Sequence, residues 1–161
     1  RLRTGAGDDL RLREALGHLG EQFVIIHRCA HAQPASWRAA GGKLTHVVID
    51  ERVPRIDETG GNERDGLLIR FVDPDQRAWH AGASCWKGRE RCNDFSIGIE
   101  LEGCDSIAFT DSQYAVLNRL IDELRARYPI VDVVGHSDIA PGRKTDPGPC
   151  FEWARLKLQS E

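Results

Sequence analysis

Apolar and polar residues follow one another along this chain in short blocks that are typical of strands and helices. Residues 22–27 (QFVIIH) are a compact apolar run with two isoleucines and a valine, and its length favours a strand over a helix. We interpret it as a central strand that is buried on both faces. Residues 44–50 and 66–72 have the same character. The polar residues between them, with Gly60 and Gly61, indicate a loop.

Two further strands are predicted in the second half of the chain. Residues 95–101 (FSIGIEL) alternate, so the three larger aliphatic side chains share one face and Glu100 lies on the other. Residues 130–135 (IVDVVG) form another apolar run, and His136 follows it directly. The pattern therefore places Glu100 opposite an apolar face and His136 at the end of a strand.

One long helix has clear sequence boundaries. Thr110 and Gln113 have the spacing of a capping box, and apolar residues follow at helical spacing up to Pro129. The weaker patterns predict short helices in three other segments, residues 8–19, 34–40 and 151–158.

Strands that alternate with helices predict an α/β fold in which helices flank a central mixed sheet. The chain has 161 residues, of which 29% are charged and 40% hydrophobic, and this composition is typical of one globular domain. We expect a single domain over residues 1–161, with an N-terminal helical segment at 1–21 and the core at 22–161. The longest apolar runs are far shorter than the roughly 20 residues that cross a bilayer, so no membrane partner is expected.

Charge and cysteine content narrow the classes of partner and compartment. The net charge is −3 with both signs interspersed, which argues against a nucleic-acid partner. The five cysteines include no Cys-x-x-Cys pair, so neither a disulfide framework nor an all-cysteine zinc site is favoured. We therefore expect a reducing, cytoplasmic compartment. The chain begins at Arg1 and has no methionine, so we expect a trimmed N-terminus and keep export as an alternative.

The loop at residues 135–149 (GHSDIAPGRKTDPGP) concentrates polar side chains just after a predicted strand, where loops often carry function. His136 and Asp146 alone are equally consistent with a solvated turn. His27, however, ends a different apolar strand, and strand ends at one edge of an α/β sheet converge on a common crevice. Two imidazoles and a carboxylate with one open position make a hydrolytic zinc site.

Four motifs give the chain a family resemblance: RAWHAG (77–82), GRERCNDFSIGIELEG (88–103), FTDSQY (109–114) and GHSDIAPGRKTDPGP (135–149). They resemble the AmpD-type N-acetylmuramoyl-L-alanine amidases, zinc enzymes of a wider family that includes phage lysozyme-like amidases and peptidoglycan recognition proteins. The resemblance runs from Gln76 to the last residue, about half of the chain.

The resemblance implies a set of site residues. The zinc ligands would be His27, His136 and Asp146. Glu100, the first glutamate of GIELEG, would be the catalytic acid and base, and Lys144 would stabilise the oxyanion. Without the resemblance, Glu100 is read as a solvated strand residue and Lys144 as an exposed loop residue.

The resemblance also suggests substrate contacts. Trp79 and His80 would line the cleft, with simple packing of His80 as the alternative. His46 would lie in the cleft wall or behind a metal ligand. Arg91 matches a position that holds a stem-peptide carboxylate, for which an arginine fork is suited, and a surface ion pair with an acidic neighbour is the alternative.

The first half of the chain departs from the family pattern. Arg28 stands where asparagine commonly follows the first ligand, the segment between His27 and His46 is shorter, and the excursion after His46 is longer and more charged. Because these segments flank the cleft, the resemblance indicates the chemistry better than the substrate.

We therefore predict a monomeric Zn²⁺-dependent amidase that hydrolyses the amide between N-acetylmuramic acid, or its 1,6-anhydro form, and L-alanine. Its partner would be a soluble muropeptide in peptidoglycan recycling. One alternative is a lysin that acts on intact peptidoglycan. Another is a non-catalytic recognition module, which would be expected to lack one of the ligands. A peptidase that uses Cys29 explains none of the motifs.

Overall fold

The computed structural model describes residues 21–29, 47–49 and 68–157. The helices expected at 8–19 and 34–40, the turn at Gly60 and Gly61, and His46 lie outside these residues. The described elements follow in the order β1 (Gln22–Cys29), β2 (Val47–Ile49), β3 (Leu68–Arg70), β4 (Cys85–Trp86), β5 (Arg89–Glu90), η1 (Cys92–Asp94), β6 (Ser96–Glu102), α3 (Asp111–Arg127), β7 (Ile130–Gly135), α4 (His136–Ile139) and η2 (Trp153–Arg155). No helix within the described ranges is long and apolar enough to cross a membrane.

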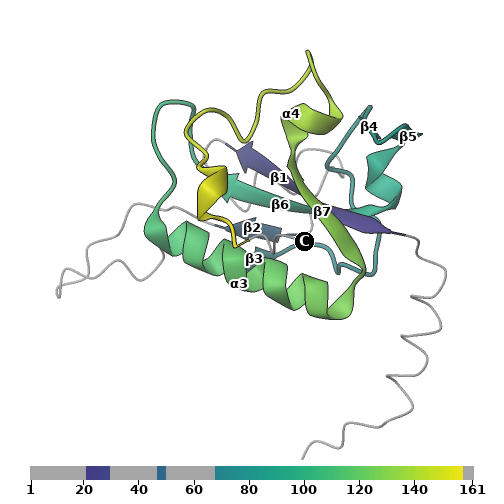
Figure 1. Cartoon of the computed structure of the whole chain (residues 1–161), viewed down its shortest axis with the longest axis horizontal. Coiled ribbons are helices and arrows are strands. Elements are labelled where there is room, and N and C mark those ends of the chain that lie inside the picture. The colour runs from purple at the N-terminus through teal and green to yellow at the C-terminus, as the bar shows by residue number, and fades with distance from the viewer. Residues whose placement is uncertain (1–20, 30–46, 50–67, 158–161) are drawn as a thin grey trace, which may run out of the picture.

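Five strands form a mixed sheet in the order β3-β2-β6-β1-β7 (Figure 1). β1 pairs in parallel with β6 and with β7, β2 pairs in parallel with β6, and β3 is antiparallel to β2. The predicted mixed sheet is confirmed, and β1 has a hydrogen-bonded neighbour on each side. The parallel pairing brings the carboxyl ends of β1, β6 and β7 to one edge of the sheet.

Both faces of β1 are buried, which explains its uninterrupted apolar run. Val24 and Ile26 pack into a cluster with the apolar side chains of β6 and α3, whereas Phe23 and Ile25 pack on the other face with Ile139 of α4. Figure 1 shows α3 along one side of the sheet and α4, β4 and β5 on the opposite side. The predicted alternation of β6 is confirmed, since its aliphatic residues belong to the α3 cluster.

The start of α3 has the predicted capping box. Thr110 Oγ1 accepts a hydrogen bond from the backbone N–H of Gln113 at 3.1 Å, and Gln113 Oε1 accepts one from the backbone N–H of Thr110 at 2.9 Å. The side-chain amide of Gln113 also donates to the carbonyl of Glu102 at 2.8 Å, which ties the helix to the end of β6. These bonds satisfy backbone groups that a helix start leaves unpaired.

The predicted helix at residues 151–158 is wrong, because the structure has only a three-residue 3₁₀ turn at η2. Phe151 and Leu156 are both buried in the α3 cluster. Residues five apart lie about 140° apart around an α-helix, so a helix would not bury both side chains. The backbone at Glu152 is extended instead, and Phe151 and Leu156 are both buried.

The sequence analysis did not predict two sets of short elements, the strands β4 and β5 and the helix α4. β4 and β5 form a hairpin around Lys87 and Gly88, which both have positive φ, as a tight two-residue turn requires. Each strand has two residues, too few to give an alternating pattern. α4 is one helical turn within the segment expected to be a loop, and Asp138 caps it by accepting from the N–H of Gly135 at 2.7 Å.

Candidate active site

The candidate site lies where β1, β6 and β7 end. β1 carries His27, which lies opposite Glu100 in the register of β6, and His136 directly follows β7. Asp146 returns to this edge on the loop after α4, where its carbonyl accepts from the N–H of Ser137 at 2.9 Å. The three predicted ligands and Glu100, which are far apart in the sequence, therefore meet at one edge of the sheet.

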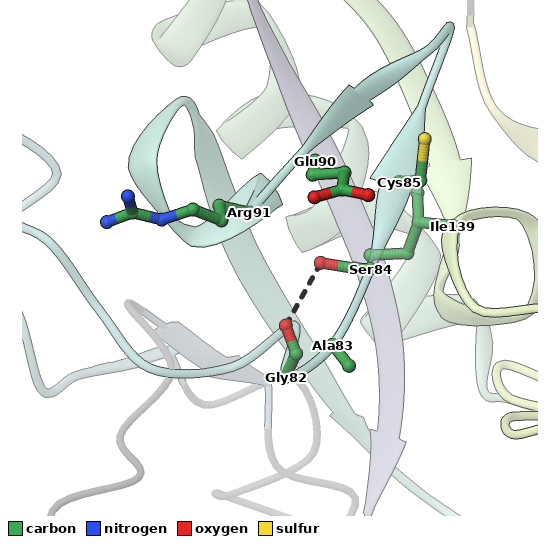
Figure 2. Close-up of a pocket in the computed structure, with 7 residues that line it drawn as sticks. All are labelled: Gly82, Ala83, Ser84, Cys85, Glu90, Arg91 and Ile139. Carbon is green, nitrogen blue, oxygen red and sulfur yellow. Dashed lines mark hydrogen bonds between the residues drawn. The ribbon is translucent and has the colours of Figure 1, made fainter.

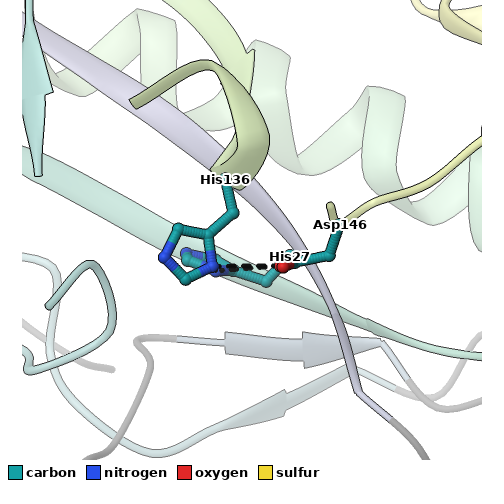
Figure 3. A group of neighbouring side chains, drawn as sticks. All are labelled: His27, His136 and Asp146. Atoms are coloured by element: carbon teal, nitrogen blue, oxygen red, sulfur yellow. Dashed lines mark hydrogen bonds and ion pairs between the residues drawn. The ribbon is translucent and has the colours of Figure 1, made fainter. Parts of the chain in front are cut away.

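The three predicted ligands point toward one another (Figure 3). Nδ1 of His27 lies 2.9 Å from Nδ1 of His136 and 3.6 Å from Oδ2 of Asp146. Nδ1 of His136 lies 3.0 Å from the same oxygen. Zinc bonds of about 2.0–2.1 Å at tetrahedral angles would place neighbouring ligand atoms about 3.3 Å apart. The three separations lie close to that value, and all three residues are buried.

The chemistry of these atoms also fits a cation. Nε2 of His136 lies 3.2 Å from the carbonyl oxygen of Ala81. Because a carbonyl only accepts, Nε2 carries a proton, and in the neutral ring Nδ1 then offers a lone pair. A lone pair 3.0 Å from a carboxylate oxygen is repelled unless a proton or a metal ion lies between them. The arrangement therefore fits a bound Zn²⁺ ion.

The pKa values of His27 and Asp146 agree with this assignment. Burial lowers the pKa of His27 to about 4, so this imidazole is neutral at neutral pH. Burial opposes ionisation of Asp146, but its polar contacts with His136 and His27 outweigh that effect, and its pKa falls below the usual range. Neutral imidazoles and an ionised carboxylate are the forms that bind a metal.

The two predicted catalytic residues lie within electrostatic reach of this cluster. Burial, together with the charge of Asp146, raises the pKa of Glu100 to about 8, and the charge of Lys144 partly offsets the rise. The Lys144 ammonium also acts to lower the pKa of His27. Lys144 itself is exposed on the loop that carries Asp146. Glu100 can therefore take up or release a proton near neutral pH, beside a loop cation.

The predicted substrate-binding residues divide into exposed and inward-facing side chains. Trp79 is exposed, and the guanidinium of Arg77 stacks 3.6 Å from the centre of its ring. Arg91 is exposed and its Nε lies 3.1 Å from Asp94, the ion pair weighed as an alternative. His80 instead turns inward, and its Nδ1 lies 2.9 Å from Nε2 of His27.

Arg91 borders a cavity of about 490 Å³ beside the β4–β5 hairpin (Figure 2). The cavity is lined by Gly82, Ala83, Ser84, Cys85, Glu90, Arg91 and Ile139. Figure 2 shows the guanidinium of Arg91 directed away from the other lining side chains. The hairpin that builds this cavity was not predicted, so sequence reasoning missed the cavity as well.

The sequence analysis did not identify two further residues that contact the site, Asn93 and Ala81. Asn93, a buried residue of η1, accepts with its Oδ1 from the backbone N–H groups of His80 at 3.0 Å and Ala81 at 2.8 Å. The carbonyl of Ala81 contacts His136. Both residues lie in motifs of the family resemblance, but no spacing rule in the sequence points to these contacts.

Comparison with known proteins assigns the family. The family model described as N-acetylmuramoyl-L-alanine amidase matches residues 20–149. The chain is 57% identical over 96 residues to 1,6-anhydro-N-acetylmuramyl-L-alanine amidase AmpD of Citrobacter freundii, an alignment that covers 58% of this chain and 51% of that protein. It is 46% identical over 151 residues to N-acetylmuramoyl-L-alanine amidase AmiD of Escherichia coli K12, covering 86% of this chain and 52% of that protein. The chain thus spans about half the length of these curated relatives.

Solved structures agree with this assignment. A crystal structure of AmpD matches with a TM-score of 0.68 and 37% identity, covering 85% of this chain and 83% of that one. AmiD from Escherichia coli, in complex with anhydro-N-acetylmuramic acid-L-Ala-D-γ-Glu-L-Lys, matches with a TM-score of 0.69 and 34% identity, covering 84% of this chain and 56% of that one. The chain therefore belongs to the N-acetylmuramoyl-L-alanine amidase family.

Proposed function

We propose that this chain is a zinc-dependent amidase that hydrolyses the amide between 1,6-anhydro-N-acetylmuramic acid and the L-alanine of soluble muropeptides. The observation that carries the proposal is the convergence of the Nδ1 atoms of His27 and His136 with Oδ2 of Asp146. A non-catalytic recognition module is disfavoured, because all three ligands and both candidate catalytic residues are present.

The three ligands would hold the ion, and two nearby residues would handle proton and charge. A bound Zn²⁺ polarises a carbonyl and makes water a nucleophile at neutral pH. Glu100, in its ionised form, would accept a proton from the attacking water, and its raised pKa would suit it to deliver that proton to the leaving amine of L-alanine. The Lys144 ammonium would stabilise the negative charge that develops on the carbonyl oxygen.

The exposed residues next to the site would contact the rest of the muropeptide. Arg91 forms an ion pair with Asp94 through Nε and its side chain is largely exposed, so its guanidinium would offer further donors to a stem-peptide carboxylate. Trp79 would offer an exposed ring to the sugar or the peptide. The likeness to AmpD supports 1,6-anhydro muropeptides as substrate, and with them a role in cytoplasmic peptidoglycan recycling.

A second candidate function is cleavage of intact peptidoglycan. The match to AmiD covers 86% of this chain, whereas the match to AmpD covers 58%. AmiD is named as an N-acetylmuramoyl-L-alanine amidase without restriction to the 1,6-anhydro sugar, and the sequence match to it includes more of the chain, which supports this second candidate.

The test is to incubate the zinc-loaded protein with a 1,6-anhydro muropeptide and, separately, with intact sacculi, and to identify the products by mass. Release of a free stem peptide beginning with L-alanine from the soluble substrate is expected. The His136→Ala variant, which lacks one metal ligand, should release none. Release from sacculi alone would favour the second candidate, and release from neither would contradict both.

A further inference from the structure

Two consecutive residues lie against both ligand histidines, on the side facing away from the cluster of donor atoms. Nδ1 of His80 lies 2.9 Å from Nε2 of His27, and the carbonyl oxygen of Ala81 lies 3.2 Å from Nε2 of His136. The ring of His80 stands nearly perpendicular to that of His27, at 85°. One short segment therefore contacts the outer nitrogen of each imidazole.

Once a metal is bound to His27, the donor and the acceptor in its contact with His80 are fixed. A metal on Nδ1 of His27 needs the lone pair of that nitrogen, so the single proton of the neutral ring must be on Nε2. Among the residues that the structure describes, Nδ1 of His80 is the acceptor within hydrogen-bond distance of that proton. His80 therefore has to present a lone pair at Nδ1, with its own proton on Nε2.

Ser96 favours that form of His80. The hydroxyl of Ser96 donates its proton to the carbonyl of Cys92 at 2.6 Å, so its oxygen is left as an acceptor. This oxygen lies 3.4 Å from Nε2 of His80, a longer contact that a proton on Nε2 makes favourable. The hydrogen bonds then run in one direction, from His27 to His80, from His80 to Ser96, and from Ser96 to the Cys92 carbonyl.

The backbone of His80 is fixed independently of its ring. The side-chain oxygen of Asn93 accepts from the N–H groups of His80 and Ala81, and Arg143 donates to the carbonyl of Ala81 at 2.8 Å. Groups that hold the outer nitrogen of a metal-binding histidine fix its ring orientation and its tautomer. The segment is thus built to orient both imidazoles.

We propose that His80 is a positioning residue for the metal, which accepts the Nε2 proton of His27 and so keeps Nδ1 of His27 aimed at the ion, with Ser96 holding His80 in the required tautomer. This inference rests on the proposed metal site. It assigns His80 a place behind a ligand, where the sequence analysis expected a place in the substrate cleft.

Two substitutions of matched shape test the proposal. In His80→Asn, the side-chain oxygen takes roughly the place of Nδ1 and still accepts a hydrogen bond. In His80→Leu, a side chain of similar shape to asparagine has no acceptor. Competition with a chromophoric chelator gives the dissociation constant for Zn²⁺ without any substrate. We expect His80→Leu to raise that constant by about 10- to 100-fold and His80→Asn to stay near the parent.

Nuclear magnetic resonance gives a second readout that packing alone would not move. The Nε2 proton of His27 should be visible and shifted downfield in the zinc-loaded parent and in His80→Asn. In His80→Leu the signal should lose this shift or disappear through exchange with solvent. If His80→Leu does not fold, Ser96→Ala takes its place and should also weaken Zn²⁺ binding, by a smaller factor.

The outcomes separate this inference from the proposed function. If the parent binds no Zn²⁺, the metal site itself is wrong, and the inference falls with it. If the parent binds Zn²⁺ and the His80 variants bind it equally well, only the role of His80 is overturned, and a raised KM would return it to the substrate cleft. Equal weakening in His80→Asn and His80→Leu would show packing, and would also overturn the proposal. An unchanged Zn²⁺ affinity in Ser96→Ala would contradict the part given to Ser96.

Discussion

Replacing Glu100 by glutamine tests the electrostatics of the site through stability. Burial and the charge of Asp146 raise the pKa of this carboxyl from 4.5 to about 8, with Lys144 opposing the rise. Between those two values the folded protein holds a proton that the unfolded chain has released. The contribution of Glu100 to stability is therefore most favourable below about pH 4.5 and is lost as the pH rises toward 8, by about 1.4 kcal/mol per pH unit.

The metal-free parent should accordingly lose up to about 4 kcal/mol of unfolding free energy between pH 5 and pH 8 because of this one group. The Glu100→Gln variant has no proton to lose at this position and should be spared that decline. Urea denaturation followed by tryptophan fluorescence at several pH values measures the difference in unfolding free energy between the variant and the parent, which should grow with pH. The matched control is Glu123→Gln, which removes the same charge from an exposed position on α3 and should track the parent. Parallel pH dependences for the parent and Glu100→Gln would refute the reasoning.

The same variant tests the proposed chemistry. Glu100→Gln should keep its zinc and lower turnover by about 10²–10⁴-fold, the range for loss of a general acid–base. Loss of zinc in this variant would mean that Glu100 is a ligand. A combined gain in stability and loss of turnover would be typical of a catalytic group held in an unfavourable environment.

Three other substitutions have defined outcomes. Lys144→Ala should lower turnover by about 10²–10³-fold with zinc content unchanged, and near-normal turnover would return Lys144 to an ordinary exposed loop residue. Arg91→Ala should lower kcat/KM by about 10- to 150-fold on a full stem peptide and far less on a substrate that ends at L-alanine; equal losses would mean that Arg91 supports the fold. Thr110→Ala should lower the unfolding free energy by about 1 kcal/mol in urea denaturation, and no change would show that the capping box contributes little to stability.

Elements with strong local signals could be predicted from the sequence. The apolar run of β1, the alternation of β6 and the capping box of α3 each follow from residues close together in the chain, and the structure confirms them. The β4–β5 hairpin could not be found this way, because its strands are two residues long and Cys85, Arg89 and Glu90 are exposed. At η2 a helical pattern competed with the burial of Phe151 and Leu156, and burial decided the conformation.

The residues of the candidate site also differ in how well the sequence alone could place them. His27 and His136 could be placed at one edge of the sheet, because both follow apolar runs of strand length. Asp146 was singled out in the 135–149 loop beside the two histidines, and the family resemblance then assigned it as the third ligand. Glu100 was chosen by the resemblance alone, since a carboxylate on a strand is ordinary. The contact between His80 and His27 joins residues 53 positions apart and depends on how the 77–82 segment packs, which no periodicity encodes.

Above all, we propose that a Zn²⁺ ion held by His27, His136 and Asp146 is required for amide hydrolysis. The most direct measurement is the zinc content and turnover of the same samples: the parent as purified, the parent after chelation, the chelated parent with zinc restored, and Asp146→Ala. We predict one zinc per chain in the parent, loss of turnover on chelation, recovery on addition of zinc, and weakened zinc binding in Asp146→Ala, which lacks one of three protein ligands. Full turnover in a rigorously metal-free sample would contradict the claim.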